Sequence, residues 1–458
     1  MLTQYKLEKP DLSSLDEEKF FKKIRGLKID LMEAVHAVSE PVYYYWDRIQ
    51  YSSDIPPELS PTEFWFYVRY VRKLSSDKTT IKAETGEYYS WLRLSSTEEL
   101  LHKLDMQLGT NELPLLSKAT FDAEQKKKFL TKSIMEEAIA SSQLEGAATT
   151  TSMAKKLLSE KRTPKDRSER MIVNNYKTMQ ALNQEYKDKK LSEEVLFELH
   201  RLITKDTLDK DKQGRYRKDV DEITVNDQMQ YIYYTPPKEA FVRQEIKRLI
   251  KFANNEDGGR FMHPIIKAIF LHFWIGILHP VCDGNGRLAR TIFYWYLLKE
   301  GYWAMQYLPI SLVIKEAPIQ YGMAFVYSEQ DKLDLTYFFN FHMRKLIQAS
   351  KNFKAYLERK VEENKNIQNL FNSSYILNPR QIQALHYLMA QGEGSYVNPS
   401  SYEVLCGISR TTAISDLKSL EKMKLVESKK TGKYMRYYGT QLLRNETSES
   451  KNQNRQQL

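Results

Sequence analysis

The sequence predicts a mainly α-helical protein with one short β-hairpin and a C-terminal winged helix-turn-helix domain. Three observations support this fold class. Apolar residues recur at helical spacing over most of residues 111–350. One stretch of that region, EITVNDQMQYIYYTPP at 222–237, has instead the Thr, Val, Ile and Tyr content of a hairpin. From about residue 375 onward, helical patterns are followed by two strand-like segments around a basic turn.

The composition describes a folded protein without a membrane segment. The chain has 458 residues and is 41% hydrophobic, which allows a sizeable core and about two to four domains. Its two cysteines, Cys282 and Cys406, exclude a disulfide framework and a cysteine-rich zinc site. The first residues show no signal-peptide pattern, and the longest apolar run, 268–278, is too short to span a bilayer. We therefore expect a soluble, cytoplasmic protein whose net charge of +10 suits an anionic ligand.

The expected domains follow the changes of pattern along the chain. Residues 1–110 form an N-terminal helical region whose many tyrosines look like packing residues. Residues 111–350 form the main helical domain, and residues 351–374 form a charged helical connector. The winged helix domain follows at 375–440. The last segment, 441–458, is polar and nearly without aromatic residues, which predicts a disordered tail.

The chemically richest segment is HPVCDGNGRLAR at 279–290, which lies between two apolar helical patterns. Its Gly-Asn-Gly sequence at 284–286 predicts a turn into a helix, where converging backbone amides can hold a phosphate. The glycines let the backbone approach an anion without obstruction by a Cβ atom. Arg287 and Arg290 lie three residues apart and therefore share a face of that helix, from which they can clamp a polyphosphate.

Two further residues supply chemistry that a phosphate site needs. Asp283 lies at the loop, where a hard cation that bridges phosphates requires an oxygen ligand. His279, at the end of the preceding helix, can take up a proton near neutral pH. A base, a metal ligand, an anion cradle and two arginines together describe phosphoryl or nucleotidyl transfer. Each element alone is common in proteins without such a site, but their order here argues against chance.

These residues resemble the Fic motif, whose pattern is His, Pro, Phe, any residue, Asp or Glu, Gly, Asn, Gly, Arg, two residues and Arg. The match covers every position of the motif with a role in the chemistry. It departs at Val281, where a Phe usually packs the loop against the core. The resemblance extends to GRYRKDVDEITV at 214–225 and YIYYTPP at 231–237, and so implies a Fic-type helical core over 111–350. It implies a Mg²⁺-dependent protein adenylyltransferase, which transfers AMP from ATP to a Ser, Thr or Tyr hydroxyl of a protein target.

The resemblance also implies a role for each residue of the motif. His279 would deprotonate the target hydroxyl, which attacks the α-phosphorus while pyrophosphate leaves. Asp283 would hold the Mg²⁺ ion that bridges the α- and β-phosphates. Asn285 and the loop amides would stabilise the α-phosphate, Arg287 would contact the phosphates, and Arg290 would contact the γ-phosphate.

Outside the motif, the resemblance implies a flap at 231–234 that covers the nucleotide. The flap would also pair with an extended segment of the target by strand addition. Tyr321 would pack near the adenine, although a tyrosine of the helical core fits the same pattern. The residues expected to bind ATP are therefore Asp283, Gly284, Asn285, Gly286, Arg287, Arg290, Tyr231, Ile232, Tyr233, Tyr234 and Tyr321.

A second motif, TKSIMEEAIASSQLEGA at 131–147, predicts a helix that ends at a Glu-Gly pair. Beside a Fic motif, it resembles the inhibitory helix of the class with N-terminal inhibition, here at about 126–146. Ser141 and Glu145 occupy its motif positions. The resemblance implies that Glu145 pairs with Arg290 and keeps ATP out of a productive pose. In some members the same Glu is proposed to position water for removal of AMP, so the direction of the reaction stays open.

The C-terminal segment adds a second candidate ligand. Residues 401–426 predict a short helix, a turn at Gly407 and a longer helix, and residues 427–439 predict two strands around a Lys-Thr-Gly-Lys wing. Such domains place the second helix in the major groove of DNA, but they also serve as protein-docking modules. Arg410, Lys418 and the wing lysines favour DNA because they suit phosphate-driven binding.

Three functions stay open from the sequence. The first is an autoinhibited enzyme that transfers AMP, and the second is a hydrolase that removes AMP with the help of Glu145. The third is a DNA-binding regulator whose Fic domain only senses nucleotide. The intact His279 favours an enzyme, because a sensor needs no general base. The protein target, the DNA site and the formation of a homodimer are left open.

Overall fold

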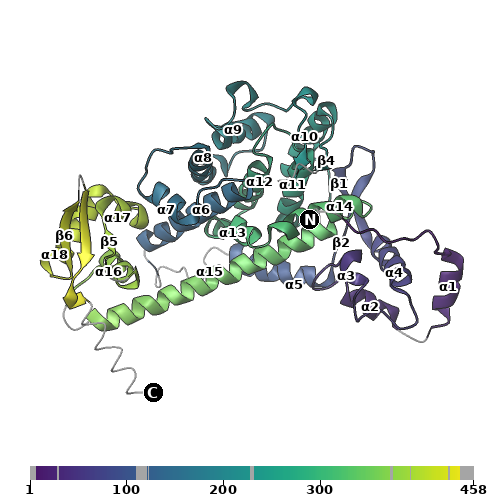
Figure 1. Cartoon of the computed structure of the whole chain (residues 1–458), viewed down its shortest axis with the longest axis horizontal. Coiled ribbons are helices and arrows are strands. Elements are labelled where there is room, and N and C mark those ends of the chain that lie inside the picture. Colours follow the sequence, from purple (N-terminus) through teal and green to yellow (C-terminus); the bar gives the residue numbers. More distant parts are fainter. Residues whose placement is uncertain are drawn as a thin grey trace, which may run out of the picture. The chain divides into compact units, whose positions relative to one another are not determined.

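The computed structural model describes residues 7–27, 30–109, 121, 123–226, 232–371, 375–391, 394–431 and 434–443. This part of the chain is mainly helical with few strands, as the sequence predicts (Figure 1). None of its helices is long and apolar enough to cross a membrane. The contacts divide the chain into two units that are each assembled from three segments. The first contains Met1–Gly109, Lys177–Trp303 and Ile310–Gln348, and the second contains Thr110–Tyr176, Ala304–Pro309 and Ala349–Leu458.

The N-terminal part of the first unit contains a hairpin that the sequence analysis missed. Strands β1 and β2 are antiparallel, with Ser76 opposite Leu92. The sequence contains a signal for this hairpin, because the β-branched residues Thr79, Thr80 and Ile81 precede a turn at Gly86. The elements of this part are α1 (Glu17–Arg25), α2 (Leu31–Ala37), α3 (Trp46–Ile49), α4 (Pro61–Leu74), β1 (Ser76–Lys82), β2 (Tyr88–Leu92) and α5 (Ser95–Leu104).

The core of the first unit is built around two adjacent helices, α11 and α12, which pack against each other. All but two of the fifteen residues of α11 are buried, which is typical of a core helix that is apolar on every side. Pro264 stands at its first position, where a missing N–H is harmless. The helices of this core are α9 (Glu193–Thr204), α10 (Glu239–Ala253), α11 (Pro264–Leu278), α12 (Asn285–Lys299), α13 (Ile310–Lys315), α14 (Pro318–Gln330) and the first part of α15 (Thr336–Phe371).

The second unit is built around α6. Phe129 of α6 packs edge to face on Tyr356 of α15, with ring centroids 5.6 Å apart. The Nζ of Lys132 lies 3.8 Å from the centroid of the same Tyr356 ring. Elsewhere on α6, Met135 and Ile139 are buried in a cluster with apolar residues of α7 and α8. The helices of this part are α6 (Ala123–Leu144), α7 (Thr151–Ser159) and the first part of α8 (Arg167–Ala181).

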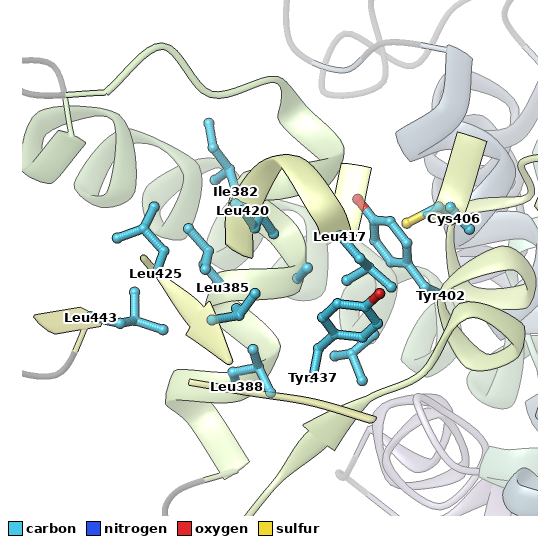
Figure 2. Packing of buried hydrophobic residues seen from close by; sticks show 14 residues of the cluster. Ile382, Leu385, Leu388, Tyr402, Cys406, Leu417, Leu420, Leu425, Tyr437 and Leu443 are labelled. Carbon is cyan, nitrogen blue, oxygen red and sulfur yellow. The ribbon is translucent and has the colours of Figure 1, made fainter. Parts of the chain in front are cut away.

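The C-terminal part of the second unit has its own core between three helices and an antiparallel sheet of order β5-β7-β6 (Figure 2). Leu385 of α16 and Leu417 of α18 are fully buried in this core. The elements occur in the order that a winged helix predicts, and that assignment stays a prediction. They are α16 (Pro379–Gln391), β5 (Tyr396–Val397), α17 (Pro399–Cys406), α18 (Arg410–Lys422), β6 (Val426–Thr431) and β7 (Tyr434–Gly439).

Leu443 corrects the start of the predicted disordered tail. Its side chain is only 1% exposed and belongs to the C-terminal core, together with Leu388 and Leu425 (Figure 2). The ordered domain therefore continues past the expected boundary at residue 440, because an apolar side chain there completes the core. Residues 444–458, the rest of the predicted tail, lie outside the described residues.

The C-terminal elements pack against α6 and α7 within the second unit. The Nζ of Lys127 on α6 donates a hydrogen bond of 2.6 Å to the carbonyl oxygen of Gly407. Lys161 and Glu403 form an ion pair at 3.6 Å, and Val404 packs on the buried cluster of α6 and α7. The helix predicted to be inhibitory therefore shares a unit with the predicted winged helix domain, whereas the sequence analysis placed it in one contiguous domain with the motif.

Candidate functional site

The motif lies on the loop between α11 and α12 in the first unit. α11 ends at His279, whose backbone adopts the left-handed conformation with φ 44° and ψ 58°. The amide of His279 still donates to the carbonyl oxygen of Ile275 at 3.0 Å, so the residue closes the helix as it turns the chain. Residues other than glycine are uncommon in this conformation, which costs about 1 kcal/mol or more and persists only where surrounding contacts hold it.

A hydrogen bond fixes the tautomer of the His279 ring. Its Nδ1 lies 2.7 Å from the carbonyl oxygen of Gly276. Because a carbonyl oxygen can only accept, Nδ1 must carry the proton, and the lone pair of the neutral ring is on Nε2. This is the tautomer that a general base acting through Nε2 requires.

Arg217 holds the same turn and was not singled out by the sequence analysis, although it lies in the quoted segment 214–225. Its Nε donates to the carbonyl oxygen of His279 at 2.6 Å, and its Nη2 donates to the carbonyl oxygen of Pro237. Its backbone amide donates to Pro280 at 2.9 Å. Burial lowers the pKa of the guanidinium. One buried arginine thus ties the chain after the hairpin to the backbone of the candidate base.

The side chain of Asn285 shapes the loop. Its Nδ2 donates to the carbonyl oxygen of Val281 at 2.8 Å, and its Oδ1 accepts from the amide of Val281 at 3.0 Å. Both polar groups of the side chain are therefore engaged within the loop, and the expected contact of this side chain with the α-phosphate stays a prediction. Val281 itself is fully buried, so the residue that departs from the family pattern still packs the loop against the core.

The start of α12 has the geometry that the predicted anion cradle requires. The helix follows Gly284, whose φ of 85° and ψ of 14° glycine adopts readily. A Cβ atom on Gly284 would also lie only 3.3 Å from Cγ2 of Thr204. The first amides of a helix, here those of Asn285, Gly286 and Arg287, have no acceptor within the helix, and the helix dipole adds positive potential at this end.

Asp283 and Arg287 are adjacent at this loop. The Oδ1 of Asp283 lies 3.6 Å from Nη2 of Arg287 and accepts a hydrogen bond of 2.6 Å from the amide of Gly284. Arg287 is fully buried, and its Nη1 donates to the carbonyl oxygen of Ile203 at 3.1 Å. The Asp283 side chain is 30% exposed, so it can meet a ligand that enters from solvent.

The residues present fit a Mg²⁺ ion that arrives with a nucleotide. No group of three or more His, Cys, Asp or Glu side chains able to hold a metal ion occurs in the part of the chain that the structure describes. Asp283 offers a single carboxylate beside the amide cradle. Mg²⁺ in nucleotide sites is commonly held by one or two carboxylates together with phosphate oxygens, so this donor set suits a substrate-borne ion.

Arg290 is buried one turn further along α12 and is 3% exposed. Two histidines near it are kept neutral. Burial lowers the pKa of His342 to about 3 and that of His272 well below its usual value, and the charge of Arg290 contributes to both shifts. The neutral rings of His272 and His342 therefore add no positive charge next to the Arg290 guanidinium at neutral pH.

Tyr321 lies in a cluster of aromatic and histidine side chains. Its hydroxyl is 2.9 Å from Nε2 of His272, and its ring packs edge to face on Phe325 with centroids 5.4 Å apart. These contacts are those of a tyrosine of the helical core. A core tyrosine was one of the two interpretations of Tyr321 that the sequence allowed, and packing near the adenine was the other. The adenine contact stays a prediction.

A short antiparallel hairpin stands where the flap was predicted. β3 (Val225–Asn226) pairs with β4 (Ile232–Tyr234), and Val225 is opposite Tyr234. The Tyr234 hydroxyl donates to the carbonyl oxygen of Ile277 on α11 at 2.5 Å, and burial raises the pKa of this hydroxyl. Tyr234 therefore anchors the hairpin to α11, and its role in covering a nucleotide stays a prediction. Tyr231, also predicted to lie in the flap, is outside the described residues.

Ser141 and Glu145 lie at the C-terminal end of α6, in the second unit. The helix stops where the sequence predicts, because Gly146 adopts the left-handed conformation with φ 89°. The amide of the next residue, Ala147, donates to the carbonyl oxygen of Ser142 at 3.0 Å. Ser141 is buried and Glu145 is half-buried.

His200 on α9 is a residue of the site that the sequence analysis missed. It is fully buried, and its ring nitrogens lie 2.9 Å from the carbonyl oxygen of Asp283 and 2.9 Å from the amide nitrogen of Gly214. A histidine between apolar residues of an amphipathic helix is typical of a core position, so the local pattern held no signal for this contact.

A family model described as the Fic/DOC family matches residues 190–297. The matched segment runs from the start of α9 to the end of α12 and so contains the hairpin, the cradle and the loop of His279. Residues 190–297 therefore match a Fic domain. Curated relatives of the chain include a protein of Caenorhabditis elegans named protein adenylyltransferase fic-1, which is 29% identical over 69 residues. A Caenorhabditis briggsae protein of the same name matches equally.

These relatives are matched over a small part of their length. The shared segment covers 15% of this chain and 13% of the C. elegans relative. Among solved structures, a Fic family protein from Desulfovibrio desulfuricans G20 is similar at 19% identity, with a TM-score of 0.46 over 75% of this chain and 96% of that chain. C. elegans Fic-1 is similar at 18% identity, with a TM-score of 0.44 over 56% of this chain and 71% of that chain. The assignment of the Fic domain therefore rests on the matched segment and its loop.

Proposed function

We propose that this chain is a protein adenylyltransferase that transfers AMP from ATP to a hydroxyl side chain of a protein. The observation that carries the proposal is the tautomer of the His279 ring. Its Nδ1 donates a hydrogen bond to the carbonyl oxygen of Gly276, so the lone pair of the neutral ring is on Nε2. His279 lies directly after α11, and the loop that follows it leads to the amide cradle at the start of α12. The names of the two nematode relatives support the same reaction.

In the proposed reaction, Nε2 of His279 takes the proton of the target hydroxyl. The hydroxyl oxygen forms a bond to the α-phosphorus, and the bond from that phosphorus to the leaving pyrophosphate breaks. The amides at the start of α12 and the Arg287 and Arg290 guanidinium groups stabilise the phosphate charge. A Mg²⁺ ion held by Asp283 would neutralise charge on the α- and β-phosphates when it is bound.

The proposal includes autoinhibition by Glu145. We propose that the Glu145 carboxylate pairs with the Arg290 guanidinium, which the γ-phosphate would otherwise contact. ATP then binds in a geometry that does not allow transfer. The support is the position of Ser141 and Glu145 at the end of a long helix that stops at a left-handed glycine. α6 also carries contacts with the C-terminal elements, so disturbance of those elements can reach Glu145 through the same helix.

The test is incubation of the full chain with Mg²⁺ and ATP labelled on the α-phosphate. Label on the protein itself or on a second protein, lost in His279→Ala, supports the proposal. Absence of label even in Glu145→Gly, in a folded chain that binds ADP, contradicts it. Release of AMP from a previously modified target, lost in Glu145→Gly, would identify removal of AMP as the main reaction.

A second candidate function, DNA binding by the C-terminal domain, is supported by the exposed side of α18. Thr411, Ser415, Lys418 and Lys422 are exposed at helical spacing and include no acidic residue. Lys430 of β6 is exposed as well. Duplex DNA retention that falls steeply with salt, and that weakens in a Lys418→Ala, Lys422→Ala variant, supports this function. Retention that is unaffected by both substitutions would contradict it.

A further inference from the structure

We propose that His200 is a positioning residue that holds the Asp283–Gly284 peptide of the Fic loop in the orientation needed to bind an anion. The inference rests on the proposed function, in which that anion is the phosphate chain of a nucleotide. His200 reaches neither the target nor the nucleotide in this proposal. It acts only through the loop.

The contacts of His200 determine its tautomer. The amide of Gly214 can only donate, so Nδ1 of His200 accepts this hydrogen bond at 2.9 Å. Nε2 therefore carries the proton and donates to the carbonyl oxygen of Asp283 at 2.9 Å. Only the neutral ring can make both hydrogen bonds, because one ring nitrogen must accept and the other must donate.

The peptide that His200 contacts is one that could otherwise flip. The φ of 85° and ψ of 14° at Gly284 are typical of the third residue of a type II turn. Rotation of the preceding peptide by about 180° converts a type II turn into a type I turn, and glycine adopts both conformations readily. The sequence of the loop therefore leaves the orientation of this peptide weakly determined.

The orientation matters because the carbonyl oxygen and the amide hydrogen of a trans peptide point in opposite directions. His200 holds the carbonyl oxygen of Asp283, and the Asp283 carboxylate accepts from the amide of Gly284 at 2.6 Å. A flipped peptide would present a carbonyl oxygen on the side where an amide now lies. In the observed orientation the amide of Gly284 holds the Asp283 carboxylate, whereas a carbonyl oxygen on that side would repel this carboxylate and any phosphate that approaches the loop. His200 thus keeps the loop in the form that favours an anion.

Two substitutions separate the contacts of His200. In His200→Gln, the side-chain amide can donate near the position of Nε2, so the contact with Asp283 is retained. In His200→Asn, the shorter side chain can accept near the position of Nδ1, so the contact with Gly214 is retained and the one with Asp283 is lost. Each variant leaves one buried polar group without its partner, and we expect similar losses of thermal stability.

The measurements are calorimetric ADP binding and the separation of kcat from KM for ATP in the full chain. We expect His200→Asn to weaken ADP binding by roughly 10- to 100-fold and to raise KM, while His200→Gln stays within a few-fold of wild type. Equal losses in both variants, in proportion to their thermal midpoints, would show a merely structural role and overturn the inference. Wild-type affinity in His200→Asn would overturn it as well.

A measurement on the unsubstituted chain covers the case in which a variant does not fold. Nitrogen chemical shifts of labelled histidine should show a protonated Nε2 and an unprotonated Nδ1 at His200, with a change on addition of ADP. The opposite tautomer would overturn the inference. A chain that binds ADP but transfers no AMP contradicts the proposed function and leaves the ADP comparison of the two variants valid. A chain that binds neither ADP nor pyrophosphate overturns the inference itself.

Discussion

Arg217 donates to the carbonyl oxygen of His279 at 2.6 Å, although the two residues are 62 positions apart in the sequence. The left-handed backbone of His279 is therefore held by a buried guanidinium that also binds the chain after the hairpin at Pro237. This contact couples the orientation of the candidate base to the position of the hairpin. A change at Arg217 should then disturb the base without removing any group that reacts.

Arg217→Lys tests this coupling. A lysine keeps the charge but lacks the planar fork that reaches two carbonyl oxygens at once, so the turn at His279 should loosen. We expect the rate of AMP transfer to fall by roughly 10- to 100-fold with a smaller change in ADP affinity. Arg215→Lys is the matched control, because Arg215 pairs with Asp221 instead. Equal effects of the two substitutions on transfer would argue against the coupling.

His279→Ala should abolish transfer while ADP binding remains. The cradle amides and the arginines belong to α12 and do not depend on the imidazole ring. A general base typically contributes ~10²- to 10⁴-fold to the rate. Single-turnover transfer and calorimetric ADP binding should be measured on the same preparation. Transfer at close to the wild-type rate would remove His279 from the mechanism.

Glu145→Gly should raise AMP transfer from ATP, because the proposed pairing with Arg290 must break before a γ-phosphate can bind. A charge-assisted hydrogen bond contributes ~1.5–3 kcal/mol, which corresponds to a gain of roughly 10- to 150-fold. Addition of His279→Ala should silence the activated variant, since the gain uses the same site. Unchanged transfer in a folded variant that binds ATP would instead support a helix-end role for Glu145.

Val404→Asp probes the contact between the C-terminal elements and α6. A carboxylate at this position would meet the apolar cluster that includes Met135 and Ile139, and α6 should become less well anchored. If Glu145 inhibits through α6, transfer should rise several-fold while the thermal midpoint falls. Glu403→Gln is the control, since its ion pair with Lys161 is partly exposed and worth at most about 1 kcal/mol. A lower midpoint without a rise in transfer would separate this contact from inhibition.

Glu329 on α14 should make the stability of the chain depend on pH. Burial raises its pKa from 4.5 to about 8, so between these values the folded form binds more protons than the unfolded form. The contribution of Glu329 to the free energy of unfolding should therefore fall as the pH rises from about 5 to about 8, by at most roughly 1.4 kcal/mol per pH unit. Glu329→Gln should remove this dependence and stabilise the chain at pH 8 relative to wild type.

Denaturant unfolding of wild type and Glu329→Gln at pH 5, 7 and 9 measures this effect as a difference between the two proteins. The difference is needed because His200 acts in the opposite direction. Its lowered pKa of about 4 makes the folded chain less stable as the pH falls below about 6.5. Parallel pH profiles of the two proteins would show that Glu329 does not carry a raised pKa.

The sequence by itself determined the local features of the site. The apolar run of α11, the Gly-Asn-Gly turn and the helix with two arginines follow from residue types at fixed spacing, and so does the stop of α6 at Gly146. The hairpin at 225–234 was predictable for the same reason. These features depend on backbone preferences and periodicity, which a single segment contains in full.

Only the tertiary structure decided which residues hold these features in place. Arg217 and His200 act on the loop through hydrogen bonds to backbone carbonyls, and any residue could supply such a carbonyl. Nothing in the local sequence therefore marks the pairing. The same holds for Leu443, whose burial depends on a core formed by other helices and strands. Contacts between segments that are far apart arise from packing of the whole unit, and spacing along the chain contains no record of them.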